Sequence, residues 1–389
     1  MKVGILTLPL HTNYGGNLQA YALINVLKKN NIDVVFLDRQ RNKYNPLRYL
    51  ISLPKGVVKK YILRKPAPIF DFLKAKLEYD QVSIHAREFT DHYIKPKSAA
   101  LYNGDDLLRE CQNLRLDAII VGSDQVWKPS YTPDIYNYFF DFADPDKINL
   151  KRISYAASFG NDDWKYTDLE TQRCASLLKK FSAISVREDL AVTQCKEHFA
   201  VDATHVLDPT LLLAAEDYLS LLTDKGLEKT STVTSYVLDN SDFINTVFAK
   251  VSKSFACKIS RLNTRTEELN APIEERIAPP VQDWLHGIYT AKLLITDSFH
   301  GCAFAILFNV PFIVIGNERR GISRFNSLLN LFALQARMVK SESDITRALN
   351  HTIDWHDVNA RLSVSKEESL GFLLTALDQK TELTPSSQK

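Results

Sequence analysis

The chain has 389 residues, of which 45% are hydrophobic and 24% charged, so it is long and apolar enough to fold into two globular domains. Its formal net charge at pH 7 is only +2, which excludes the strong basic excess of a protein dedicated to nucleic acid. The five cysteines are scattered without a CxxC pair, so neither a disulfide framework nor a zinc site is expected.

Short strand-like and helix-like segments alternate from the N-terminus onward. Residues 1–6 read as a first strand and not as a signal peptide. No apolar run approaches the roughly 20 residues that span a bilayer, so we expect a cytoplasmic protein. Helical patterns such as residues 18–29 and 188–198 lie between the strands and indicate βαβ units with parallel sheets. The predicted strands, mostly continuous apolar runs typical of strands covered on both faces, are residues 3–8, 34–37, 118–121, 153–157, 183–186, 232–238, 293–296 and 312–315.

A proline at position 209 marks a boundary, because the residue before a proline disfavours helix. A new series of strands begins near residue 232. We therefore predict an α/β fold of two Rossmann-like domains with parallel sheets, residues 1–210 and 211–345, that face each other across a cleft. Residues 346–389 are predicted as a helix near residues 367–377, where Ser365 and Glu368 have capping-box spacing, followed by a disordered tail.

A basic segment lies in an insertion predicted over residues 41–115 of the first domain. Residues 41–70 contain eight Lys or Arg residues, no Asp or Glu, and interleaved aromatic and aliphatic side chains. Such a segment is either a solvated basic loop or a contact surface for anionic lipid. Prolines at positions 46, 54 and 66 interrupt any long amphipathic helix, which favours the loop.

A histidine lies where a predicted strand of the second domain gives way to a helix. The strand 293–296 ends before Ser298 and the helical pattern begins near Cys302, so His300 lies in the turn. Ligands of open α/β sheets bind at the carboxyl ends of strands, and helix N-termini attract anions. With Ser298 as the N-cap, His300 can serve as an acid-base group for an acidic substrate. The alternative is a histidine that only caps or packs.

Arginines follow two other predicted strands. Arg187 comes after residues 183–186, at the start of a helix, where a cation opposes the helix dipole unless an anion is bound. Arg319, Arg320 and Arg324 follow residues 312–315. Arginine binds carboxylate and phosphate through two parallel hydrogen bonds. An anion clamp and ordinary surface salt bridges remain the two interpretations.

The loop after the first strand is rich in glycine. Asn13, Gly15, Gly16 and Asn17 open the helix that follows, and such a turn lets the backbone approach a phosphate or a sugar. The segment lacks GxGxxG and GxxxxGK[ST], so dinucleotide and P-loop nucleotide binding are not supported.

A polar turn with a tryptophan follows the strand 118–121. Asp124 and Gln125 can hydrogen-bond sugar hydroxyls, and Trp127 can stack on a sugar ring. The alternative is an ordinary turn with a tryptophan in the core. The histidines show no metal-ligand spacing such as HExxH, so no metal is expected.

Taken in order, these segments resemble the polysaccharide pyruvyl transferase family over about residues 3–337. The resemblance implies a fold like that of the GT-B glycosyltransferases. It also implies transfer of pyruvate from phosphoenolpyruvate to a sugar, as a cyclic ketal, in cell-surface polysaccharide (exopolysaccharide) biosynthesis. The matching segments are NYGGNLQA at 13–20, VGSDQVW at 121–127, SYAASFG at 154–160, SVRE at 185–188, DPT at 208–210 and DSFHG at 297–301.

The resemblance also implies roles for individual residues. His300 is the implied acid-base catalyst, with phosphoenolpyruvate as co-substrate and no other cofactor. Many family members carry Arg where this chain has Ser298, so either a neighbouring arginine substitutes or the donor site is altered. The implied donor-binding residues are Arg187, Ser298, Arg320 and Arg324. The implied acceptor-binding residues are Asn13, Gly15, Gly16, Asn17, Asp124, Gln125 and Trp127.

Two other functions remain open. A GT-B glycosyltransferase with a nucleotide-sugar donor would need an acidic ribose-binding residue, for which Glu318 is the candidate. A non-catalytic, sugar-binding relative would need no acid-base group. The basic segment further suggests a lipid-linked sugar acceptor and peripheral contact with the inner face of the membrane.

Overall fold

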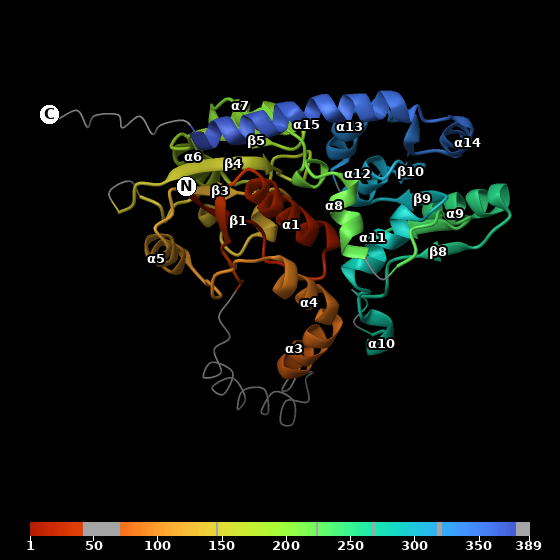
Figure 1. The fold of residues 1–389 in the computed structure, drawn as a ribbon, viewed down its shortest axis with the longest axis horizontal. Helices are drawn as coiled ribbons and strands as arrows, with labels where there is room; N and C mark the ends of the chain where they lie inside the picture. Colours follow the sequence, from red (N-terminus) through yellow and green to blue (C-terminus); the bar gives the residue numbers. More distant parts are fainter. Residues whose placement is uncertain are drawn as a thin grey trace.

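The strands of the two predicted series form two separate parallel sheets (Figure 1). The computed structural model describes residues 1–41, 71–144, 147–222, 225–266, 268, 270–316 and 321–378. The first sheet has the strand order β2-β1-β3-β4-β5-β6, and the second has the order β11-β10-β9-β7-β8. The predicted α/β fold of two Rossmann-like domains with parallel sheets is confirmed.

The strands of both sheets are short, and most of those inside the sheets are buried on both faces. In β3 all four residues of the sequence AIIV are buried. The first sheet consists of β1 (Lys2–Leu6), β2 (Asp33–Phe36), β3 (Ala118–Val121), β4 (Lys151–Ala157), β5 (Ala183–Val186) and β6 (Thr204–His205). The second sheet consists of β7 (Val233–Tyr236), β8 (Ile259–Arg261), β9 (Leu293–Thr296), β10 (Phe312–Ile315) and β11 (Met338–Val339).

Helices cover both sheets, and several begin at a side-chain cap. Asn13 caps α1 by accepting a hydrogen bond from Gly16 N, and Ser241 caps α9 in the same way. The first domain contains α1 (Tyr14–Lys29), α3 (Asp71–Val82), α4 (Ile84–Tyr93), α5 (Gly104–Leu114), α6 (Asp168–Leu178), α7 (Asp189–Phe199) and α8 (Ala215–Leu219). The remaining helices are α9 (Asp242–Phe255), α10 (Ile273–Arg276), α11 (Val281–Tyr289), α12 (Phe299–Leu307), α13 (Ile322–Leu331), α14 (Glu342–Asn350) and α15 (Trp355–Asp378).

One hydrophobic cluster joins the two domains through α1, α11, α12 and α15. At its centre the ring of Tyr14 from α1 stacks on Trp284 from α11, with 5.4 Å between ring centroids. The Tyr14 hydroxyl donates a hydrogen bond to the Pro279 carbonyl at 2.8 Å, and burial raises the pKa of this phenol well above its usual range. The N-terminus of α1 is thus fixed against the second domain by both apolar and polar contacts.

The last helix crosses from the second domain to the first (Figure 1). The hydroxyl of Ser369 accepts a hydrogen bond from Leu207 N at 2.9 Å, and Lys151 of β4 donates one to the Leu377 carbonyl. The helix begins at Trp355, so the predicted start near Ser365 is wrong. Residues 355–378 contain neither proline nor a capped break, and the single Gly371 does not interrupt the helix. The predicted tail, residues 379–389, lies outside the described residues.

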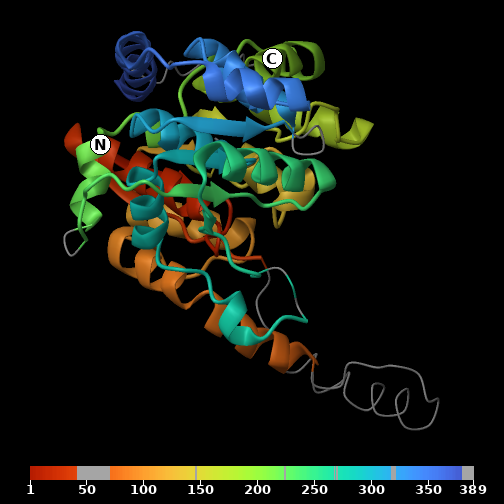
Figure 2. The same ribbon diagram turned by 90° about the vertical axis from the view of Figure 1, so that its right-hand side faces the viewer.

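The insertion in the first domain reaches the second domain through α3 and α4. Both views show α3 beside α10 (Figures 1 and 2). Arg276 of α10 forms an ion pair with Glu78 of α3 at 2.7 Å, and Ala278 N donates to the Val82 carbonyl at 3.4 Å. The basic stretch, residues 42–70, lies outside the described part of the chain.

In the described parts of the chain, we find no helix whose length and hydropathy together would let it cross a bilayer.

Candidate active site

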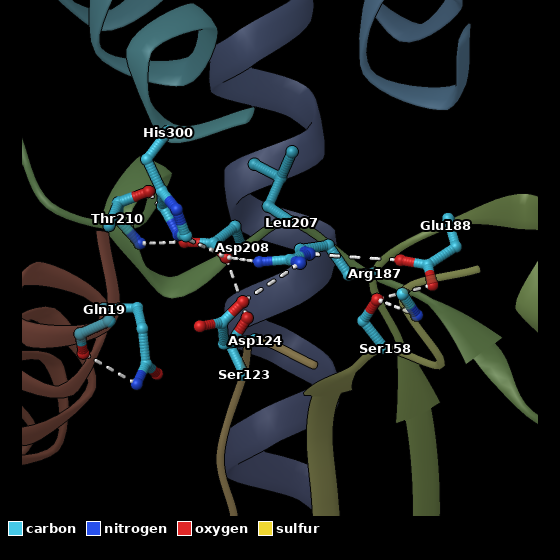
Figure 3. A network of polar contacts seen from close by, with 12 residues as sticks. Gln19, Ser123, Asp124, Ser158, Arg187, Glu188, Leu207, Asp208, Thr210 and His300 are labelled. Atoms are coloured by element: carbon cyan, nitrogen blue, oxygen red, sulfur yellow. Dashed lines mark hydrogen bonds and ion pairs between the residues drawn. The ribbon is translucent and has the colours of Figure 1, made fainter. Parts of the chain in front are cut away.

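The carboxyl ends of strands from both sheets meet at one place (Figure 3). The first sheet contributes Asp124 after β3, Arg187 after β5 and Asp208 after β6. The second sheet contributes His300, in the first turn of the helix that follows β9. Parallel α/β folds bind ligands at this edge of a sheet, and here the two edges share one network.

Asp208 is the centre of this network and is completely buried. Its carboxylate accepts hydrogen bonds from Ser123 Oγ at 2.7 Å, Arg187 Nη1 at 2.9 Å and Thr210 Oγ1 at 2.7 Å. Burial alone would raise the pKa of Asp208, but His300 and Arg187 outweigh burial and hold the pKa well below its usual range. The sequence marked this residue as part of a domain boundary and of the segment DPT in the family resemblance, but assigned it no role, since the preceding β6 has just two residues.

His300 lies between the two domains. Its Nε2 is 3.5 Å from Asp208 Oδ2, and its side chain is 8% exposed. On the other side of the ring, a Cβ placed on Gly15 of α1 would come within 2.0 Å of His300 Nδ1. The imidazole of the second domain is therefore enclosed by an acidic residue and a helix terminus of the first.

Ser298 caps α12, as the sequence predicts. Its hydroxyl accepts a hydrogen bond from Gly301 N at 3.3 Å, and its own backbone N–H donates to Thr296 Oγ1 at 3.0 Å. This capping fixes the turn that presents His300. A direct contact of Ser298 with a donor substrate stays a prediction.

Arg187 carries the buried positive charge of the site, with a side chain only 1% exposed. It lies 2.9 Å from Asp208, 3.5 Å from Asp124 and 3.9 Å from Glu188, and these carboxylates raise its pKa although burial opposes them. Its guanidinium also lies over the Phe299 ring of the second domain, 4.2 Å from the centroid. Only Nη1 makes a hydrogen bond among the described residues, while Nε and Nη2 make none.

Glu188 is a buried acid that the sequence did not single out as a site residue. The Ser158 hydroxyl donates a hydrogen bond to its Oε1 at 2.7 Å. Burial raises the pKa of Glu188 despite the nearby Arg187. In the sequence it stands out only as the last residue of the family-matching segment SVRE, and it makes no side-chain capping bond to α7.

Arg324 of α13 brings a second buried guanidinium to the same region. Burial, together with the positive charge of Arg187, lowers the pKa of Arg324 to about 10. The helix begins after Gly321, whose φ of +73° suits glycine and where a Cβ would come within 2.7 Å of the Gly160 carbonyl of the first domain. The predicted Arg320, together with Arg319 and Glu318, lies outside the described residues.

The predicted acceptor residues of the first loop have different surroundings. Asn13 is the cap of α1, and Gly16 donates the capping hydrogen bond at 3.3 Å. Gly15 contacts His300, as described above. Asn17 is buried and donates from Nδ2 to the His11 carbonyl at 2.8 Å, while its Oδ1 has no hydrogen-bond partner among the described residues.

Of the three acceptor residues predicted after β3, one lies in the buried network and two make packing contacts. Asp124, with a φ of 74°, lies beside Arg187 in the buried network. Gln125 packs against Gly160, where a Cβ would come within 2.1 Å of Gln125 Oε1. The prediction that Trp127 stacks on a sugar is wrong, because its side chain is completely buried and stacks on Phe139 at 5.1 Å. The polar turn before Trp127 is compatible with either a buried or an exposed ring, so the sequence could not distinguish the two.

The part of the chain that the structure describes contains no group of three or more His, Cys, Asp or Glu residues that could hold a metal ion.

The chain is similar to one protein family in sequence and to several solved structures in fold. The model of the polysaccharide pyruvyl transferase family matches residues 13–319, most of the chain. No curated protein sequence matches. The structure of UDP-GlcNAc 2-epimerase from Methanocaldococcus jannaschii is similar, with a TM-score of 0.53, 13% identity, and coverage of 96% of this chain and 100% of that one. The structure of UDP-GlcNAc 2-epimerase from Neisseria meningitidis, bound to UDP-GlcNAc, is also similar, with a TM-score of 0.50 and 10% identity. The match covers 96% of this chain and 100% of that one. At these identities the likeness establishes the fold, which is GT-B-like.

Proposed function

Because the chain belongs to the polysaccharide pyruvyl transferase family, we propose that it transfers pyruvate from phosphoenolpyruvate to a sugar and forms a cyclic ketal in cell-surface polysaccharide synthesis. The observation that carries this proposal is the contact between His300 and Asp208 at 3.5 Å, with Arg187 bound to the same carboxylate at 2.9 Å. It unites an acid-base group from one domain with an anion-binding group from the other.

Phosphoenolpyruvate carries a carboxylate and a phosphate, so its binding requires cations. Arg187 supplies Nε and Nη2, which are buried without a hydrogen-bond partner in the described residues. Arg324 supplies a second guanidinium on the side of the second domain. Buried guanidiniums bind such anions more strongly than exposed ones because less water competes.

The reaction needs a proton at the methylene carbon of phosphoenolpyruvate, and His300 donates it. Protonation makes C2 electrophilic, a sugar hydroxyl adds to C2, and its proton returns to His300. The C–O bond to phosphate then breaks, and the second hydroxyl closes the ketal as its proton leaves with inorganic phosphate. A positioned acid-base group contributes roughly 10²–10⁴-fold to such a rate. Asp208 holds the ring in place and compensates the charge of the imidazolium that each cycle forms.

The test is product analysis with the full chain. Phosphoenolpyruvate is incubated with galactosides, mannosides and glucosides, free and lipid-linked. We expect inorganic phosphate to appear in a one-to-one ratio with a sugar that carries a ketal carbon by ¹³C NMR. Release of UDP from a UDP-sugar, with no phosphate from phosphoenolpyruvate, would instead identify a glycosyltransferase. If neither phosphate nor UDP is released, the protein would be a sugar-binding relative without transferase activity.

A lipid-linked acceptor lies at the membrane surface. To reach it, the protein would contact anionic lipid through its basic segment, residues 41–70. We expect the full chain to co-sediment with vesicles that contain anionic lipid. Neutralising Lys55, Lys59 and Lys60 together should weaken the binding, because each cation near such a surface contributes about 1 kcal/mol. Equal sedimentation of the two proteins, or equal binding to neutral vesicles, would contradict membrane contact through this segment.

A further inference from the structure

Gln19 of α1 carries a buried polar atom that the donor chemistry above does not use. The residue is 1% exposed. Its Nε2 donates hydrogen bonds to Thr7 Oγ1 at 2.9 Å and to the Gly16 carbonyl at 3.0 Å. Its Oε1 has no hydrogen-bond partner among the described residues.

The orientation of this amide follows from its partners. The Gly16 carbonyl can only accept, and the Thr7 hydroxyl donates its own proton to the Ser123 carbonyl at 3.3 Å. Both contacts therefore require the NH₂ group of Gln19 on their side. The oxygen must point the other way, and buried oxygens in native proteins rarely lack a donor.

The oxygen lies beside the loop that follows β3, which carries Ser123 and Asp124 of the active site. Gln19 lies one helical turn beyond Gly15, on the same face of α1, and Gly15 is the residue that touches His300. A Cβ on Gly122 would be 3.7 Å from Gln19 Oε1, and the next residue, Ser123, donates to Asp208. In Figure 3 the Gln19 side chain lies on the α1 side of the network, below the Asp208 and His300 pair and to the left of Ser123 and Asp124.

A bare amide oxygen selects the chemistry of its partner. It repels the anionic oxygens of phosphoenolpyruvate, and it attracts a group that donates a hydrogen bond. It cannot take up a proton near neutral pH, so it orients a hydroxyl and does not deprotonate it. The uncharged, hydroxyl-bearing substrate of the proposed reaction is the sugar.

We propose that Gln19 Oε1 accepts a hydrogen bond from one hydroxyl of the acceptor sugar and positions the sugar ring beside His300. Gln19 is in this view a specificity-determining residue of the acceptor site. The inference rests on the proposed function, since it assigns one side of the same site to the sugar and leaves the cationic side to phosphoenolpyruvate.

The experiment compares how hydroxyl groups contribute to binding in the wild type and in two variants. Gln19→Met removes the oxygen at nearly constant volume, and Gln19→Glu keeps an oxygen in its place. Gln112→Met is the matched control, because Gln112 is an exposed residue of α5 whose side chain donates to the Lys147 carbonyl. Methyl β-galactoside and its monodeoxy derivatives are tested as inhibitors of pyruvyl transfer to the active acceptor, with phosphoenolpyruvate present. If a mannoside is the active acceptor, methyl mannoside and its monodeoxy derivatives are used instead.

In the wild type and in Gln112→Met we expect one monodeoxy derivative to bind about 3- to 10-fold more weakly than the parent glycoside, the size of one neutral hydrogen bond. In Gln19→Met we expect the parent glycoside to bind more weakly by the same factor, so that the parent and the monodeoxy derivative bind equally well. In Gln19→Glu the parent should still bind more tightly than this derivative. The dissociation constant of phosphoenolpyruvate should stay within about 2-fold in Gln19→Met and Gln112→Met, the two variants that add no charge.

Two results would overturn the inference while the proposed function stands. One is a wild type that transfers pyruvate but binds every monodeoxy derivative as well as the parent, a measurement that needs no variant. The other is a Gln19→Met variant that is folded and keeps the wild-type difference. Failure of the proposed function itself would appear earlier, as a wild type that neither binds phosphoenolpyruvate nor releases phosphate from it.

Discussion

Asp208 shows how much of the site depends on one side chain. It accepts hydrogen bonds from three other residues and also lies beside the imidazole of His300. A buried carboxylate with so many donors is stable only in its charged form. Its removal leaves Arg187 without its strongest partner, and an unpaired buried charge is costly.

We therefore expect Asp208→Asn to lower the free energy of unfolding by about 2–4 kcal/mol at pH 7. Because the pKa of Asp208 in the folded state is held below its unfolded value, its stabilising contribution is complete above about pH 4 and is lost as the pH falls further. The difference between wild type and variant should shrink in urea denaturation below about pH 4. A difference that stays constant from pH 7 to pH 3 would contradict this account. Asp202→Asn, an exposed control paired with Lys196, should change stability by less than about 0.5 kcal/mol.

His300→Gln should lower the rate of phosphate release from phosphoenolpyruvate by roughly 10²–10⁴-fold. The dissociation constant of phosphoenolpyruvate should change much less, because Arg187 and Arg324 remain in place. Steady-state kinetics, donor binding and circular dichroism together separate a lost proton transfer from a lost fold. His356→Gln, at an exposed position of α15, is the control. Normal turnover by a well-folded His300→Gln protein would rule out the proposed acid.

The sequence predicted which strand ends carry the site better than which side chains fill it. His300 and Arg187 could be named because each follows a short, mainly apolar strand. Trp127, Asp208 and Gln19 could not be assigned correctly, since burial and contacts across the domain interface depend on packing between residues far apart in the chain. Local spacing contains no information about these partners.

At the scale of the element, the N-terminus of α1 is built to approach another domain. Gly15 and Gly16 are adjacent in its first turn, yet only Gly15 faces His300. A Cβ on Gly15 would come within 2.0 Å of the imidazole, whereas a Cβ on Gly16 would meet nothing closer than 3.6 Å. The first position therefore has no room for a side chain, whereas the second has.

This difference gives a matched pair of substitutions. We expect Gly15→Ala to displace the imidazole or separate the domains, and so to lower both stability and transfer activity, the latter by at least roughly 10-fold. We expect Gly16→Ala to be neutral or to stabilise the protein by up to about 1 kcal/mol, because alanine favours helix. Thermal unfolding and phosphate release check both variants. Equal effects of the two substitutions would contradict the close contact.

The longer elements could be predicted from the sequence and the shortest ones could not. All eight predicted strands are present, because runs of Val, Ile and Leu buried on both faces give a strong local signal. The strands that were missed, β6, β8 and β11, have only two or three residues and lie at sheet edges. Such short segments owe their conformation to the neighbouring strand rather than to their own pattern.

At the scale of the whole molecule, the two domains are joined at a point distant in sequence from the site. The ion pair of Glu78 and Arg276 connects the insertion of the first domain to α10 of the second. Arg276 is almost completely buried and Glu78 is partly exposed, so the pair is screened only in part.

We expect Glu78→Gln to lower the free energy of unfolding by about 1–2 kcal/mol, because Arg276 keeps its charge and loses its counter-charge. Glu88→Gln on the neighbouring α4 removes an exposed carboxylate paired with His85 and serves as control, with an effect below about 0.5 kcal/mol. Chemical denaturation of the full chain measures both. Identical stability of the two variants would show that this contact does not hold the domains together.

The course of α15 has a consequence for synthesis of the protein. The ribosome releases the strands of the first sheet, residues 2–205, long before Ser369 emerges to bind the backbone N–H of Leu207. That N–H belongs to the residue before Asp208, so this one support of the turn forms only near the end of translation, after Ser123, Arg187 and Thr210 have emerged. Translation that stopped short of α15 would yield a protein with the strands of the first sheet but without the hydrogen bond that fixes the backbone before Asp208.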